Sequence, residues 1–305
     1  MSQLELDVLR RENVRQPAVF TDTPSDLLSR VREAKIDVFS VTDHDATAGC
    51  EQIGSLLRSG DPRFLFGVEF SCKDEHGKYH ILGYGYDPNA EAIRSIVKTG
   101  HANRMKKLGL RLQLLRDVYG IRFPDADIDA LYACNNPGKP HLANLMVRYG
   151  YAGSVREAFM SVLNRLHVSD AYIRPEDAIK AVLASGGIAV LAHPCYGDGD
   201  QLILGEELEN RVERLCAFGL EGLECFYSGF TDALQGETLA LADAHGLYVT
   251  AGSDYHGTNK LIALADTGLS EGKRFPKGLE RFLSDAFSRG MKSVDSSFDH
   301  KELLK

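Results

Sequence analysis

The sequence predicts an α/β protein with a mostly parallel sheet, crossover helices and one helical insertion. Strand-like apolar runs recur along the chain, and amphipathic helical patterns separate several of them. Strands that alternate with helices are typical of parallel sheets. With 305 residues, 44% of them hydrophobic, the chain is long enough for an α/β barrel or a two-part α/β protein.

The strand predictions rest on short runs rich in β-branched and aromatic residues. These runs are 36–41, 64–70, 79–86, 187–193, 222–227 and 247–252. A helix is predicted over 24–35, where apolar residues recur at helical spacing and Thr23 or Ser25 can cap the start. The same kind of pattern predicts helices over 205–218 and 231–245.

The block from about 91 to 185 differs from the rest because its helical periodicity is unbroken. We interpret it as a helical insertion in an α/β scaffold formed by residues 1–90 and 186–290. The remaining 291–305 segment is polar, and we expect a loosely held tail.

Composition excludes several classes of protein. A net charge of −8 argues against a large nucleic-acid-binding surface. It does not exclude a local basic pocket for a phosphate. No apolar run approaches the roughly 20 residues of a membrane span, and the N-terminus carries charges where a signal peptide has its apolar core. Six cysteines without CxxC spacing indicate reduced thiols, so we expect a cytoplasmic protein.

Histidine and acidic side chains lie at or near the ends of the predicted strands. They are His44, Glu69, His80, His193, Asp254 and His256. In a parallel barrel the carboxyl ends of the strands face one mouth, so these groups would converge. Imidazole and carboxylate together suit zinc, manganese or iron, and closely spaced ions can clamp a phosphate and activate water.

Each of these residues also has an ordinary structural explanation. A lone buried histidine such as His80 usually belongs to the core, and Asp43 or Asp45 could cap the turn after residue 41. The joint placement of the six residues on strand ends favours a metal site. We therefore interpret His44 as a ligand, with Asp43 and Asp45 orienting it or its neighbours.

Six motifs carry a resemblance to a known family. They are TDHDATAG (42–49), GVEFSC (67–72), YHILGY (79–84), KPHLANLMVRYG (139–150), GGIAVLAHP (186–194) and GSDYHG (252–257). The chain resembles the PHP family (polymerase and histidinol phosphatase) of metal-dependent phosphoesterases. Its helical insertion looks like the branch of nucleoside 3′,5′-bisphosphate phosphatases and 5′→3′ exonucleases of short RNA. The resemblance implies a distorted (β/α)7 PHP barrel with an inserted helical domain.

The resemblance also implies a site for three divalent ions, with manganese expected first and zinc or iron as alternatives. The six residues at the strand ends would be the metal ligands, and Glu69, His80 and His193 would form one complete set. His44, Glu69 and Asp254 would take part in catalysis.

Arg104, Lys139 and His141 stand where family members bind the substrate phosphates. Lys139 replaces an arginine that is frequent in the branch, which would turn a bidentate grip on phosphate into a point-charge contact.

The N-terminus departs from the family pattern. The expected strand ending in Asp-x-His-x-His is missing, and no histidine precedes His44. The best alignment puts Leu9 and Arg11 at the two histidine positions and Val19 at the position of the acid. Three explanations compete: a degenerate enzyme with fewer ions, a binding protein without turnover, or a segment 1–20 that is not the natural one.

These observations predict an enzyme that hydrolyses phosphate monoesters of nucleotides or short RNA by metal-activated water. Its partners would be phosphorylated small molecules, nucleotides or short RNA. We expect no binding to a membrane and no large nucleic-acid surface. One alternative is a non-catalytic nucleotide-binding protein. Another is an amidohydrolase-like hydrolase, which ranks lower because the sequence offers no evident candidate for a carboxylated lysine.

Overall fold

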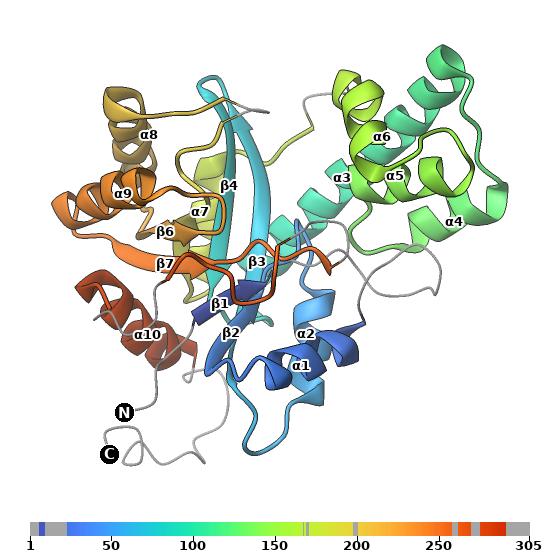
Figure 1. Ribbon diagram of the computed structural model, residues 1–305. Coiled ribbons are helices and arrows are strands. Elements are labelled where there is room, and N and C mark those ends of the chain that lie inside the picture. The colour runs from blue at the N-terminus through green and yellow to red at the C-terminus, as the bar shows by residue number, and fades with distance from the viewer. Residues whose placement is uncertain are drawn as a thin grey trace.

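The computed structural model describes residues 6–9, 23–166, 168, 171–197, 201–257, 262–269 and 275–290. Its strands form a seven-stranded sheet in chain order (Figure 1). The strands are β1 (Leu6–Leu9), β2 (Val38–Val41), β3 (Arg63–Asp74), β4 (Gly77–Tyr84), β5 (Ile188–Leu191), β6 (Gly222–Tyr227) and β7 (Tyr248–Gly252). β1 also contacts β7, so the sheet curls rather than staying open.

Most strand pairs are parallel, as predicted, and β4 is the exception. It pairs antiparallel with both β3 and β5, whereas the pairs β1–β2, β2–β3, β5–β6 and β6–β7 are parallel. A tight hairpin joins β3 to β4, with no helix between them. The α/β class with a curled sheet is thus confirmed, whereas the distorted (β/α)7 barrel stays a prediction.

Helices cover the sheet on its outside (Figure 1). They are α1 (Pro24–Glu33), α2 (Ala48–Leu56), α7 (Pro175–Ala184), α8 (Gly205–Ala217), α9 (Asp232–Ala244) and α10 (Lys277–Gly290). Helix α1 begins as the sequence predicts: the Thr23 hydroxyl accepts the Asp26 N–H at 3.0 Å, and Pro24 occupies the first turn.

Between β4 and β5 the described elements are all helical. They are α3 (Glu91–Tyr119), α4 (Asp125–Ala133), α5 (Lys139–Arg148), α6 (Val155–Ser161), the 3₁₀ turn η1 (Leu163–Arg165) and α7. α3 to η1 share a hydrophobic cluster of their own, which includes Leu115 and Met146. α7 instead contributes Ile179 and Val182 to the core of the sheet. The insertion limits 91 and 185 stay a prediction, and the 291–305 tail lies outside the described residues.

None of the described helices has both the length and the apolar character that a membrane crossing requires. The six cysteines are free thiols.

The packing of α10 on the sheet generates a stability prediction. Phe282 is fully buried, and its ring lies 5.3 Å from that of Tyr84 and 6.2 Å from that of Tyr248, centroid to centroid. We expect Phe282→Ala to lower the free energy of unfolding by about 3–5 kcal/mol, because it leaves a cavity at this contact. Urea denaturation measures the change. Ser284→Ala, at an exposed position of the same helix, is the control and should stay within about 0.5 kcal/mol of the wild type. Similar values for both variants would contradict this packing.

Candidate functional site

The loop that follows β2 carries His44 to the side of Glu69. β2 ends at Val41, but its neighbour β3 continues to Asp74. Beyond Val41, the edge of β3 that faced β2 has no strand beside it, so the loop after β2 can pair with it. The Asp45 N–H donates to the Glu69 carbonyl at 2.8 Å, and the Glu69 N–H donates to the Asp43 carbonyl at 3.1 Å. These two bonds fix His44 and Glu69 side by side.

His80 reaches the same place from β4. In the β3–β4 ladder, Ser71 pairs with His80, and Glu69 lies two residues before Ser71. Residues two apart on a strand share a face, as do directly paired residues on neighbouring strands. His80 therefore points to the same face as Glu69, although it lies in the middle of its strand rather than at the end.

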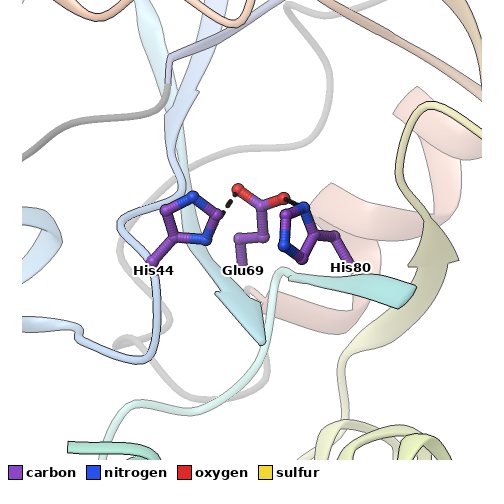
Figure 2. Close-up of side chains that lie close together, drawn as sticks. All are labelled: His44, Glu69 and His80. Atoms are coloured by element: carbon purple, nitrogen blue, oxygen red, sulfur yellow. Dashed lines mark ion pairs between the residues drawn. The ribbon is translucent and has the colours of Figure 1, made fainter. Parts of the chain in front are cut away.

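Glu69 lies at the centre of a cluster with three imidazoles, two of which, those of His44 and His80, flank its carboxylate in Figure 2. Its carboxylate is fully buried, with Oε1 2.9 Å from Nδ1 of His80 and Oε2 3.3 Å from Nδ1 of His44. The third imidazole belongs to His193 after β5. Its Nε2 lies 3.1 Å from Nδ1 of His80 and 3.7 Å from Oε1 of Glu69. Three of the predicted ligand side chains thus surround the fourth.

The donor set fits a divalent metal ion. Ligand atoms of His44, Glu69 and His80 all lie within 4.8 Å of one another. Two nitrogen or oxygen ligands of one ion, each about 2.0–2.1 Å from it, stand roughly 3 Å apart. The separations within the cluster are close to this value, and the mixture of imidazole and carboxylate suits zinc, manganese or iron.

His193 is held by a buried acid that the sequence analysis did not identify. Glu224, on β6, is 1% exposed and accepts the His193 N–H at 2.8 Å. His193 needs this support because its φ of 29° lies in a region that L-residues rarely adopt. Asp45 and Asp254, with φ of 55° and 54°, share this feature. A charged residue inside the apolar run 222–227 was the signal that could have revealed Glu224.

Asp254 and His256 lie after β7 and connect to the cluster through Tyr227. The Tyr227 hydroxyl donates to Asp254 Oδ2 at 2.8 Å, and its ring centroid is 5.6 Å from that of His193. Nδ1 of His256 lies 2.8 Å from the Asp254 carbonyl oxygen. A proton on Nδ1 would satisfy that carbonyl and make Nε2 the electron-pair donor of the ring. Tyr227 is a further residue that the sequence analysis missed.

Arg104, one of the three predicted substrate residues, is buried in the middle of α3. Its Nε donates to Asp45 Oδ2 at 2.9 Å and its Nη2 to the Ser71 hydroxyl at 3.2 Å, while Asp45 Oδ1 accepts the Ser71 N–H. Gly100 allows this approach, because a Cβ there would lie 2.8 Å from Cβ of Asp45. Asp45 therefore ties the loop that bears His44 to α3, a role that its sequence position alone does not reveal.

The other two predicted substrate residues start helix α5. His141 is buried, and its Nδ1 accepts the Gly138 N–H at 3.1 Å. Burial, and secondarily the charge of Arg104, lowers the pKa of His141 to about 3, so this imidazole is neutral at pH 7. Lys139 donates from Nζ to Asn164 Oδ1 at 3.2 Å.

The N-terminal positions are only partly described. The backbone of Leu9 ends β1 in register with Val41 of β2, which places it at the same edge of the sheet as the loop that bears His44. Arg11 and Val19 lie outside the described residues.

Comparison with known proteins supports the resemblance. No protein-family model matches the chain. The chain is 31% identical to a 3′,5′-nucleoside bisphosphate phosphatase of Chromobacterium violaceum, across 77% of this chain and 82% of the relative. It is 30% identical to a phosphoribosyl 1,2-cyclic phosphate 1,2-diphosphodiesterase of Eggerthella lenta, across 78% and 89%. It is 28% identical to a 5′–3′ exoribonuclease of Salmonella typhimurium, across 77% and 80%.

Two solved structures resemble the whole fold. One, from Bifidobacterium adolescentis, is described as a metal-dependent phosphoesterase. It is 25% identical to this chain and has a TM-score of 0.76, and the match covers 97% of this chain and 98% of that one. The other, from C. violaceum, is described as an amidohydrolase with bound sulfate and no metal; it is 25% identical, has a TM-score of 0.77, and the match covers 93% and 96%. From the identity over most of the bisphosphate phosphatase, together with the shared fold and the His–Glu cluster, we conclude that the chain belongs to the PHP family of metal-dependent phosphoesterases.

Proposed function

We propose that this enzyme hydrolyses a phosphate monoester of a nucleotide or of a short RNA at the Glu69 cluster. One observation carries the proposal: a fully buried carboxylate lies within 2.9–3.7 Å of three imidazoles. The relatives reported above are named for the cleavage of nucleotide phosphates, a cyclic phosphate and RNA. They do not favour the non-catalytic or amidohydrolase alternatives, although one structural neighbour carries the amidohydrolase description.

In this proposal Glu69, His80 and His193 hold one divalent ion, and His44, Asp254 and His256 contribute to further ions. Manganese is our first choice of metal. When bound, such ions lower the pKa of water and neutralise charge on a phosphate. The residues of the chain fix where this happens: Glu224 positions His193, and Tyr227 positions Asp254.

The proposed substrate contacts are Arg104, Lys139 and His141. The guanidinium of Arg104, anchored on Asp45 and Ser71, can present its remaining N–H groups as a fixed donor to a phosphate oxygen. His141, neutral at pH 7, can offer its Nε2–H without adding charge, because Nδ1 accepts a hydrogen bond.

Glu69→Gln tests the proposed metal site. The substitution keeps the size of the side chain but removes the negative charge among the imidazoles, so bound metal per chain and turnover should both fall. Loss of outer-shell partners already costs about 10–100-fold in affinity or activity, and we expect at least that much here. Elemental analysis and hydrolysis of a nucleoside 3′,5′-bisphosphate measure the two quantities. Glu75→Gln, at an exposed position of the β3–β4 turn, is the control. Unchanged metal content in Glu69→Gln would exclude Glu69 as a ligand.

A second prediction concerns the altered N-terminus. If Leu9 and Arg11 occupy ligand positions, the combination Leu9→His, Arg11→His and Val19→Asp should raise bound manganese and turnover together. The matched control moves the histidines one residue back, with Val8→His, Arg10→His and Val19→Asp. The family pattern Asp-x-His-x-His fixes the positions of both histidines, so histidines shifted by one residue should gain neither metal nor rate.

A parent protein that already binds three ions and turns over rapidly would show that other residues complete the site. Metal gained without activity would place the defect in the substrate pocket.

A further inference from the structure

We propose that Arg104 of α3 is a positioning residue for the metal ligand His44. Arg104 holds Asp45, the residue next to His44, by an ion pair, so that the inserted helices set the affinity of the site for a divalent ion. The inference rests on the proposed metal site and deepens it. It gives Arg104 a function before any substrate binds, in addition to the phosphate contact proposed above.

The loop that bears His44 is held in place at Asp45. The Asp45 side chain is 3% exposed, and both of its carboxylate oxygens are used. Oδ1 accepts the Ser71 N–H at 2.9 Å, and Oδ2 accepts the Arg104 Nε–H at 2.9 Å. The Asp45 N–H donates to the Glu69 carbonyl at 2.8 Å. Asp45 therefore lies between β3 and α3, and a displacement of Asp45 also displaces the adjacent His44.

The backbone of this loop needs support from its surroundings. Asp45 has a φ of 55°, a left-handed conformation that is unfavourable for residues other than glycine. Such a conformation persists only where the surrounding structure determines it. A buried carboxylate is also strongly unfavourable once its cationic partner is removed. We therefore expect the loop to relax away from its position beside Glu69 when Arg104 is removed.

Arg104 takes its own position from the inserted helices. It lies on α3, whose residues Leu108 and Leu115 belong to the hydrophobic cluster shared by α3 to η1. Besides Asp45, its guanidinium contacts the Ser71 hydroxyl, to which Nη2 donates at 3.2 Å. The insertion thus reaches the loop that bears the metal ligand through the Arg104 side chain.

α3 also comes close to Asp45 at Gly100, about one turn before Arg104. A Cβ at Gly100 would lie 2.8 Å from Cβ and 3.1 Å from Cγ of Asp45, and 3.0 Å from Cδ1 of Ile173. Alanine at this position must therefore push the loop and α3 apart. Alanine favours a helix more than glycine does, so the substitution does not weaken α3 itself. Gly100→Ala thus displaces the loop without altering any charge.

Charge alone predicts the opposite result from positioning. A guanidinium repels a nearby divalent cation, and its removal leaves the negative charge of Asp45 uncompensated. On electrostatic grounds, a variant without Arg104 would therefore bind metal more tightly. If Arg104 positions His44, the same variant binds metal more weakly, because a nitrogen ligand is displaced. The sign of the change in affinity separates the two explanations.

The test measures Mn²⁺ binding to the full-length chain, freed of metal with EDTA and then dialysed, with no substrate or phosphate present. Arg104→Met removes the charge, and its control is Arg116→Met, at an exposed position of the same helix. Gly100→Ala is the charge-neutral variant. Its control is Gly109→Ala, where a Cβ would meet the hydroxyl of the exposed Tyr132 at 3.1 Å. Calorimetry gives the Kd and the number of ions per chain, and circular dichroism checks that each variant is folded.

We expect Arg104→Met and Gly100→Ala to raise the Kd of at least one Mn²⁺ ion about tenfold, at the low end of the cost of losing a partner that orients a ligand. The two controls should stay within about twofold of the wild type. In a His44→Ala background, Arg104→Met should cause no further loss of affinity, because both changes act on the same ligand.

Unchanged or tighter binding in Arg104→Met would overturn the proposal. An equal loss in the His44→Ala background would overturn it as well, because it would indicate a general loosening of the chain. Should Arg104→Met not fold, Gly100→Ala decides by the same criteria. Manganese binding that does not depend on Arg104 overturns this inference alone, whereas a wild-type chain that binds no manganese contradicts the proposed metal site and this inference with it.

Discussion

The buried carboxylate of Glu69 imposes the main constraint on this structure. An ionised carboxylate that is completely removed from water is unfavourable unless nearby positive charge or hydrogen-bond donors compensate it. Here the compensating groups are imidazoles, which are weak partners when neutral but good metal ligands. The loop after β2, the middle of β4 and the loop after β5 must each bring a ring nitrogen close to this carboxylate. The curled sheet is the scaffold that makes this convergence possible.

β3 orders the site because it is longer than its neighbours. On the edge away from β4, the part of β3 that extends beyond β2 pairs first with the loop 43–45, at Glu69. It then pairs with the segment around Ile173, at Cys72. Alternate residues of β3 share a face and stand roughly 7 Å apart. Glu69 thus belongs to the cluster of imidazoles, Ser71 to the Arg104 contact, and Lys73 to the segment around Ile173. Three successive contacts of the site region are thus arranged along one strand.

Local patterns predicted β2 to β7 and the helices α1, α8 and α9, because burial and periodicity decide these features, but they did not predict β1, α2 or α10. They could not predict the direction of β4, which depends on the tight hairpin at residues 75–76. His80, a predicted ligand, therefore lies in the middle of a strand and not at a strand end. The Asp45–Arg104 contact joins residues 59 positions apart, and the support of His193 by Glu224 joins two strands. Such pairings depend on tertiary packing, which neither spacing nor composition encodes.

The backbone at Asp45, His193 and Asp254 shows where the demands of the site and of folding stability diverge. Each residue adopts a positive φ, which costs a non-glycine residue about 1–2 kcal/mol. Glycine would relieve the strain at all three positions and would remove a side chain of the site each time. Selection of this chain for thermostability alone would therefore favour glycine at these three positions and remove side chains of the candidate site. Any stability-guided redesign or directed-evolution library should hold the three positions constant.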